Sequence, residues 1–238
     1  MSTEILVNVT TQETRVALVE SGLVQEVFVQ RESRYSVVGN LYKGTVCRVL
    51  PGMQAAFVDV GLERTAFLHA HDILPTGDVP IGEEPAIQEL VHEGQEVLVQ
   101  VVKDPLGTKG ARLTTQLSIP SRYLVLLPYS RHVGISARIE DDAERTRLKQ
   151  TLESVIAVEG ATTGFIVRTA GEGASEEALR ADVQFLMKLW DSIRRSAKDA
   201  PKASMVYGDL PTVMRILLDL MGTDVDRVRI ASAGSYER

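Results

Sequence analysis

The first 31 residues alternate apolar and polar side chains with the period of two that is typical of β-strands. Ile5, Val7 and Val9 begin the pattern, and two further runs follow, divided by Ser21-Gly22 at a position that suits a tight hairpin. The pattern predicts a short antiparallel meander. Such a meander buries too little surface to be stable alone, so it must pack against a later part of the chain.

A second region of β-type patterning covers residues 38–117. Several short β-rich segments in one stretch of this length are typical of a small closed barrel, of which the OB fold is the commonest form. A proline- and glycine-rich insertion from Pro75 to Gln88 predicts an irregular loop. The five segments are 39–50, 53–60, 65–69, 95–103 and 111–118.

Beyond the barrel, strand-like and helix-like patterns mix, so the chain as a whole is predicted to be α+β and β-rich. Asp141-Asp142 suits the start of one helix, and Ser175 suits the N-cap of another that carries a long apolar stripe. Pro211 and Gly222 bound a third predicted helix. Strands are predicted at 123–127, 165–169 and 227–230.

Composition narrows the functional classes. The chain has 238 residues, 26 Lys+Arg against 32 Asp+Glu, and a net charge of −6, which argues mildly against a nucleic-acid binder. Its one cysteine, Cys47, excludes a disulfide framework and a cysteine-rich zinc site. No apolar run is long enough for a membrane span and no secretory signal opens the chain, so we expect a cytoplasmic protein without a membrane partner.

Two phenylalanines are the first candidates for chemistry. Phe57 in QAAFVDVG and Phe67 in RTAFLHAH both fall on predicted barrel strands. Exposed aromatic rings on such strands stack on unpaired bases, at about 1–3 kcal/mol per base. Lys43 and Lys109 could contact nearby backbone phosphates. The alternative is that both rings are core residues, and the acidic balance of residues 38–117 does not favour binding.

The second candidate is the segment Arg168-Thr169-Ala170-Gly171-Glu172-Gly173-Ala174-Ser175. A strand, a glycine loop and a helix start in succession form a plausible phosphate pocket, because helix N-termini attract anions. The guanidinium and the hydroxyl at its start would add hydrogen bonds. The alternative is an ordinary capped helix, which the glutamates of the segment favour. No group of carboxylates, histidines and cysteines indicates a catalytic or metal site.

Four long stretches carry a resemblance to a known family: NLYKGTVCRVLPGMQAAFVDVGLERTAFLHAHDI, VQVVKDPLGTKGARLTT, PSRYLVLLP and GFIVRTAGEG. From Ile5 to Arg238 the chain resembles the amino-terminal portion of the ribonuclease E/G family, in particular its ribonuclease G branch. The resemblance implies a magnesium-dependent, single-strand-specific endoribonuclease of rRNA processing and mRNA turnover. It also implies a homo-oligomer and a preference for RNA with a 5′-monophosphate end.

The resemblance also implies a domain order. An OB-type barrel of the ribosomal S-one kind and a small α/β 5′-sensor subdomain would be inserted into a split RNase H-like subdomain. The first meander would then pack with the helix and strand that follow Asp209. The expected divisions are 1–37 and 208–238 for the split subdomain, 38–117 for the barrel and 118–207 for the sensor.

Carried over position by position, the family's RNA-contacting residues match the barrel candidates Phe57, Phe67 and Lys109, with Lys43 nearby. The expected 5′-phosphate residues are Arg168, Thr169, Val125, Ser121 and Arg138. Ser121 replaces a glycine of the family's pocket, and Ala137 replaces a basic residue next to Arg138.

The family's metal-holding aspartates belong to motifs resembling V-D-I-N and I-D-F-I-D, and neither motif occurs in this sequence. We therefore expect RNA binding without cleavage, no catalytic residue and no metal ligand in this chain, with Mg²⁺ required by the full-length family enzyme. The alternative is a stand-alone regulatory RNA-binding protein. Because the barrel region is acidic, RNA binding is expected to depend only weakly on salt.

Overall fold

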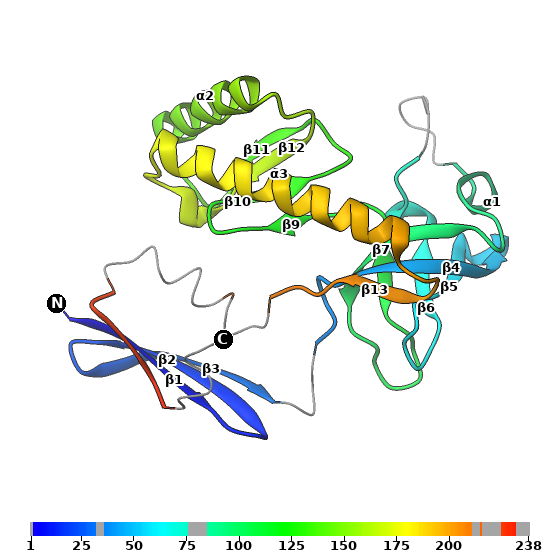
Figure 1. The fold of residues 1–238 in the computed structure, drawn as a ribbon, viewed down its shortest axis with the longest axis horizontal. Helices are drawn as coiled ribbons and strands as arrows, with labels where there is room; N and C mark the ends of the chain where they lie inside the picture. Colours follow the sequence, from blue (N-terminus) through cyan, green and yellow to red (C-terminus); the bar gives the residue numbers. More distant parts are fainter. Residues whose placement is uncertain (1, 32–35, 76–84, 211–214, 216–224, 232–238) are drawn as a thin grey trace. The chain divides into compact units, whose positions relative to one another are not determined.

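The computed structural model describes residues 2–31, 36–75, 85–210, 215 and 225–231. The chain divides into two compact units, one of residues 1–36 with 210–238 and one of residues 37–209 (Figure 1). Each unit is described below by itself. Among the described residues, no helix is both long and apolar enough to span a bilayer.

The first unit is a four-stranded sheet that joins the two ends of the sequence. β1 (Thr3–Val9), β2 (Glu13–Glu20) and β3 (Leu23–Arg31) form the predicted antiparallel meander. The Ser21-Gly22 hairpin is confirmed, because both residues have positive φ, 51° and 82°. β14 (Arg227–Ile230) pairs in parallel with β1, which confirms the predicted strand partner. The helix predicted between Pro211 and Gly222 lies outside the described residues, apart from residue 215, which is helical.

The second unit begins with the predicted barrel. β4 (Leu41–Leu50), β5 (Ala55–Asp59), β6 (Ala66–His69), β7 (Glu96–Lys103) and β8 (Arg112–Thr114) pair in the order β4-β5-β6-β8-β7, and β7 closes on β4. This confirms a closed five-stranded barrel. Its interior is filled by fully buried side chains that include Val46, Val58, Leu68, Val99 and Leu113.

Part of the predicted irregular insertion is helical. A short helix, α1 (Ile87–Leu90), buries Ile87 in the barrel core. The backbone N–H of Ile87 donates to the side-chain oxygen of Gln54 at 3.0 Å. Four helical residues are too few for a recognisable period, so the sequence pattern did not reveal this element.

The remainder of the second unit is an α/β layer. β9 (Ile119–Pro120), β10 (Leu124–Leu127), β11 (Val133–Ile135) and β12 (Gly164–Val167) form a sheet in the order β11-β12-β10-β9. α2 (Asp142–Glu159) and α3 (Glu176–Asp199) pack together with it. Both predicted helix starts are confirmed, because Asp141 accepts from Ala143 N and Ser175 accepts from Ala178 N.

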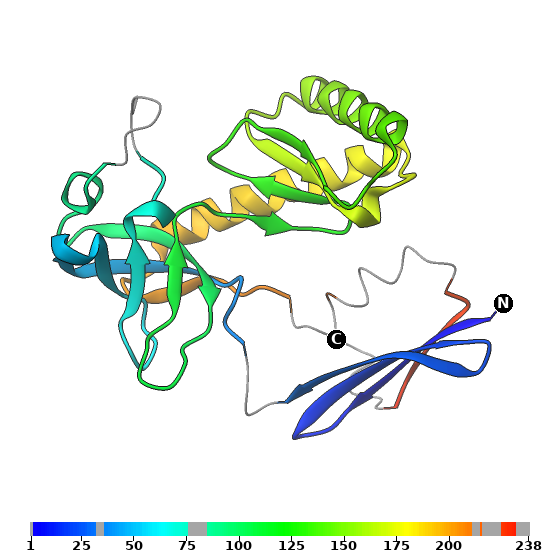
Figure 2. The same cartoon turned by 180° about the vertical axis from the view of Figure 1, so that it is seen from behind.

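One helix connects this layer to the barrel. Figure 2 shows the long helix α3 running from the α/β sheet to the barrel. The apolar stripe of α3 is buried against the α/β sheet, and the same core includes Leu41 of β4. After α3, β13 (Ser204–Tyr207) adds to β4 as an antiparallel strand. Continuous core packing and strand pairing therefore hold the barrel and the α/β layer in one unit. The buried stripe consists of Leu179, Val183, Leu186, Trp190 and Ile193.

Asp182 links α3 to the β9–β10 hairpin. Its Oδ2 accepts hydrogen bonds from the backbone N–H groups of Tyr123 and Leu124, at 2.9 and 3.0 Å, and from Ser121 Oγ at 2.6 Å. A carboxylate that accepts several bonds in a partly buried site contributes more than a neutral acceptor. The interaction fixes the hairpin against the helix.

Substitution of Asp182 tests this link. We expect Asp182→Asn to lower the free energy of unfolding by about 2 kcal/mol, because the neutral amide oxygen is a weaker acceptor for the three donors than the carboxylate. Denaturant unfolding followed by circular dichroism measures the change. Asp191→Asn, on the exposed side of the same helix, is the matched control and should change stability by less than about 0.5 kcal/mol. Equal effects of the two substitutions would contradict the role given to Asp182.

Candidate nucleic-acid interface

The two candidate phenylalanines meet on the outside of the barrel. Phe57 of β5 and Phe67 of β6 are register partners, with ring centroids 6.1 Å apart in an edge-to-face arrangement. Their strand neighbours Ala56, Val58 and Leu68 point inward and are fully buried. Both phenylalanines are half-buried, so the interpretation of them as core residues is wrong. His69, 6.4 Å from the Phe67 ring, extends the aromatic surface.

Cationic residues lie in register with this pair. Arg48 of β4 pairs with Phe57, Arg112 of β8 pairs with Phe67, and Lys103 of β7 pairs with Arg112. These three cations were missed by sequence reasoning. Strand pairing brings them together from segments far apart along the chain, and no local motif contains them.

Lys109 lies exposed on a hairpin next to the aromatic pair. Leu106 and Lys109 exchange two backbone hydrogen bonds, at 3.1 and 2.9 Å. Gly110 approaches the backbone of Thr65 so closely that a Cβ there would lie 2.0 Å from the Thr65 carbonyl oxygen. Phe67 N donates to Ala111 O at 2.7 Å, so the hairpin leaves the barrel beside Phe67.

Lys43 has a different position from the one expected. Its Nζ donates to the carbonyl of Ala200 at 3.1 Å and forms an ion pair with Glu96 at 3.3 Å. Hydrogen bonds from Lys202 and Lys43 lower the pKa of Glu96. Lys43 therefore ties the barrel to the end of α3, and its charge is already balanced by Glu96.

Two predicted 5′-phosphate residues meet at the edge of the α/β layer. Thr169 and Arg138 are both exposed, and Ser136 lies between them. The hydroxyls of Ser136 and Thr169 are 3.0 Å apart, and Arg138 N donates to Ser136 Oγ at 3.3 Å. Ser136 was not predicted, because a single serine next to a short strand carries no recognisable signal.

Arg168 lies beside this group and supports it. Its Nη1 donates to the carbonyls of Ser121 and Arg122, at 2.6 and 3.2 Å. The turn that follows, Thr169–Gly171, ends in a glycine because a Cβ on Gly171 would lie 2.7 Å from Val167 Cγ1. The guanidinium is therefore held in one place by the β9–β10 hairpin.

The structure does not support a phosphate contact through Ser121. This residue is only 7% exposed, and its hydroxyl lies within hydrogen-bond distance of Asp182 and of the Leu124 carbonyl. The hydroxyl stabilises the hairpin instead. Val125 is half-buried in the middle of β10, where it pairs with Ile166.

The helix-terminus pocket expected at the start of α3 is corrected by the structure. Ser175 caps the helix, and Glu144 accepts a hydrogen bond from Gly173 N at 2.8 Å. The pKa of Glu177 is lowered by hydrogen bonds from its own backbone and from Ser175. The chain's own side chains thus bind several of the backbone donors in this segment, and the candidate group that we consider instead is Thr169, Ser136 and Arg138.

Metal-ligating side chains do not cluster among the described residues. In the part of the chain that the structure describes, no three His, Cys, Asp or Glu side chains are grouped so that they could hold a metal ion.

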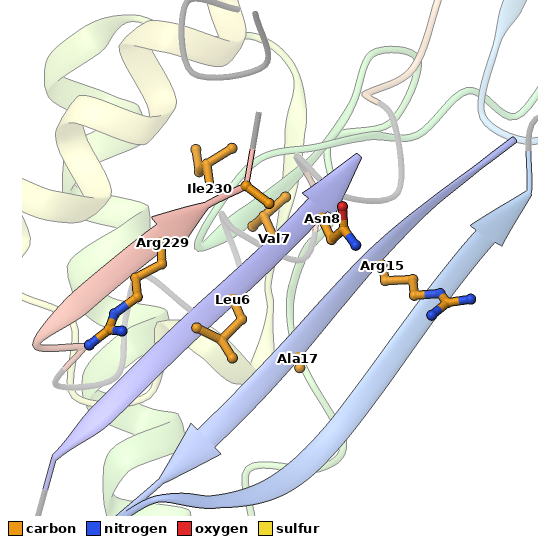
Figure 3. A pocket seen from close by; sticks show the side chains of 8 residues that line it. Leu6, Val7, Asn8, Arg15, Ala17, Arg229 and Ile230 are labelled. Carbon is orange, nitrogen blue, oxygen red and sulfur yellow. The ribbon is translucent and has the colours of Figure 1, made fainter. Parts of the chain in front are cut away.

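A separate hollow of about 340 Å³ lies on the sheet of the first unit (Figure 3). Leu6 and Ala17 line its floor, with Arg15 and Arg229 among the residues around it. Both arginines are already in ion pairs, Arg15 with Glu13 and Arg229 with Glu4. The hollow therefore has little free charge for an anionic ligand.

Comparison with known proteins identifies the family. Residues 118–238 match the profile of the "Ribonuclease E/G family". The chain belongs to the ribonuclease E/G family. Residues 37–115 of this family member match the "S1 RNA binding domain", which coincides with the barrel that carries Phe57 and Phe67. The barrel is therefore an RNA-binding domain of the S1 type.

Curated members of the ribonuclease E/G family cover nearly the whole chain. Ribonuclease G of Escherichia coli strain K12 is 49% identical over an alignment of 243 positions, which covers 100% of this chain and 49% of that protein. Ribonuclease G of Haemophilus influenzae is 52% identical, over 96% of this chain and 47% of that protein. Ribonuclease E of Escherichia coli strain K12 is 39% identical, over 94% of this chain and 21% of that protein. The chain spans about half the length of the ribonuclease G relatives.

Glu144 of α2, which holds the loop at Gly173, should make the stability of the protein depend on pH. Glu144 forms a two-pronged ion pair with Arg147 and accepts from Gly173 N, which lowers the pKa of Glu144 from 4.5 to about 2. A lowered pKa adds stability that is complete above about pH 4.5 and is lost as the pH falls toward 2. Because Arg147 is 43% exposed, solvent reduces the contribution to about 1–2 kcal/mol.

Glu144→Gln should therefore lower the free energy of unfolding at pH 7 by about 1–2 kcal/mol. The difference from the unsubstituted protein should shrink as the pH falls below about 4.5. Urea unfolding at several pH values measures it, and Glu153→Gln on the exposed face of α2 is the control. A loss that is constant with pH would contradict the ion pair as its cause.

Proposed function

We propose that this chain is the RNA-binding and 5′-monophosphate-sensing region of a ribonuclease G-like endoribonuclease. The observation that carries the proposal is the outward-facing pair of Phe57 and Phe67 in a barrel of the S1 RNA-binding type. Two surfaces have separate roles. The barrel binds single-stranded RNA, and the edge of the α/β layer binds a terminal phosphate.

On the barrel, Phe57 and Phe67 stack on unpaired bases and Lys109 contacts the backbone. The two rings are exposed enough to accept a base, and their edge-to-face contact fixes their orientation before RNA arrives. Rings that are already ordered lose little entropy on binding. Lys109, on its hairpin beside Phe67, brings a positive charge to the same surface.

At the α/β edge, Thr169 and Ser136 offer hydroxyl groups to a terminal phosphate, and Arg138 and Arg168 offer positive charge. The hydroxyls lie 3.0 Å apart, which suits two donors to one phosphate group. Arg168 is fixed by its bonds to the Ser121 and Arg122 carbonyls, so its position is set before binding. A 5′-hydroxyl end offers no such charge and would bind less tightly.

The remaining functions belong to the proposed full-length protein. By analogy with its ribonuclease G relatives, it would cleave single-stranded RNA with Mg²⁺ during rRNA processing and mRNA turnover, as a homo-oligomer in the cytoplasm. Among the described residues, no three His, Cys, Asp or Glu side chains are grouped as metal ligands, and the sequence has neither of the aspartate motifs named above. We therefore propose that this chain binds RNA and does not cleave it.

Removal of one stacking ring tests the barrel site. We expect Phe57→Ala to weaken the binding of a single-stranded oligoribonucleotide by about 1–3 kcal/mol, because one base loses its stacking partner. Fluorescence anisotropy with a labelled oligoadenylate measures the affinity, and thermal unfolding verifies that the variant is folded.

Phe185→Ala is the matched control, because Phe185 is an exposed phenylalanine on α3. It should leave RNA affinity unchanged. If Phe57→Ala lowers the melting temperature while the folded protein keeps its RNA affinity, the ring is structural and the stacking proposal is wrong.

The sensor proposal is tested with two RNA ends. We expect the protein to bind a 5′-monophosphate oligoribonucleotide more tightly than its 5′-hydroxyl counterpart. Thr169→Val, which replaces the hydroxyl by a methyl group of similar size, should reduce that difference by about 1 kcal/mol. Isothermal titration calorimetry with both oligonucleotides measures it.

Thr162→Val is the control, because Thr162 is exposed in the turn before β12. Arg138→Gln should reduce the difference between the two ends in the same way as Thr169→Val. An unchanged preference in both variants would remove the sensor assignment from this edge of the layer.

A further inference from the structure

A continuous row of outward side chains crosses the barrel from β4 to β7. Arg48 pairs with Phe57, Phe57 with Phe67, Phe67 with Arg112, and Arg112 with Lys103. Register partners on adjacent strands point to the same side of a sheet. Because β7 pairs back with β4, the row follows the curved outer wall of the closed barrel, through four inter-strand steps of about 4.8 Å or an arc of about 19 Å. It is long enough for several successive nucleotides.

Each end of the row is positioned by an irregularity in strand pairing, one between β4 and β5 and one between β7 and β8. The β4–β5 register shifts between Val46 and Arg48, and the β7–β8 register shifts between Val101 and Lys103. In unshifted ladders, the neutral residues Cys47 and Val102 would occupy the two end positions. Bulges commonly redirect side chains at binding sites, and each of these shifts places a cation in line with the rings.

The end cations differ from the central one in their availability. Arg112 Nη2 forms an ion pair with Asp72 at 2.9 Å, which fixes the guanidinium beside Phe67 and balances its charge. Arg48 and Lys103 are exposed, and neither forms an ion pair within the described ranges of the chain. The free positive charge therefore lies at the two ends, with the aromatic surface between them.

We propose that Arg48 and Lys103 bind phosphates beyond either end of the stacked bases, so that single-stranded RNA follows the curved outer wall of the barrel from one strand to the next. This inference rests on the proposed stacking at Phe57 and Phe67. Rings between two cations match a strand in which bases and phosphates occur together, because every base presents a face for stacking and every linkage carries a charge. An acidic peptide would use the cations and leave the rings without partners.

The test uses the double variant Arg48→Gln/Lys103→Gln with a short single-stranded oligoadenylate. A 5′-hydroxyl end keeps the proposed sensor out of the measurement. Each lost phosphate contact should reduce the slope of log affinity against log salt by about 0.7, or about 1.4 for the double variant. At low salt the affinity should fall about two- to thirtyfold, as expected for two exposed charge contacts. Circular dichroism verifies folding.

The matched control is Arg131→Gln/Lys149→Gln, which removes the same charge from exposed positions of the α/β layer. It should leave the slope unchanged. An equal loss of slope in both double variants would overturn the proposal, because the effect would then come from overall charge.

Phe57→Ala separates this inference from the proposed function. If Phe57→Ala weakens binding while Arg48→Gln/Lys103→Gln leaves the slope intact, stacking stands and the cationic ends are overturned. If neither variant changes binding, both proposals fail. If the slope falls and Phe57→Ala has no effect, the phosphate contacts are supported and stacking is wrong.

Discussion

The second unit depends on the burial of one helix face. The apolar stripe of α3 forms the core of the α/β layer, and Leu41 of the barrel belongs to the same core. Two hydrogen-bonded contacts of this unit, those of Asp182 and Lys43, can form only when α3 is packed in this way. Asp182 can fix the β9–β10 hairpin only because its helix lies against the sheet, and Lys43 can reach Ala200 only because the helix ends at the barrel. The RNA-binding barrel and the proposed phosphate site are therefore parts of one folded body.

The sequence predicted those features that repeat over several residues or depend on one strong local preference. Alternation located the barrel strands and the meander, and the caps at Asp141 and Ser175 located both long helices. The two-residue strand β9 and the single-turn helix α1 have no recognisable period and were missed. The family resemblance supplied the split of the first unit, which the β1–β14 pairing confirms for its strands.

The candidate sites were predictable as residue types and less so as contacts. Phe57 and Phe67 lie together on the outside of the barrel, but the cations beside them come from strand register, which two irregular pairings determine. Ser121 and Lys43 were chosen for their chemistry, and their partners, Asp182 and Glu96, lie far away in sequence. The net charge of −6 was similarly misleading, because acidic residues elsewhere in the barrel region conceal a row with free cations at both ends.

The pairing of β13 with β4 has a practical consequence for dissecting the protein. β13 covers the side of β4 at Leu41, Tyr42 and Lys43, yet it lies about ninety residues beyond the last barrel strand. A fragment cut at the end of the S1 match would expose unpaired backbone groups along β4, and an exposed strand edge promotes aggregation. A soluble fragment for structural or binding work should therefore extend from residue 37 to residue 209.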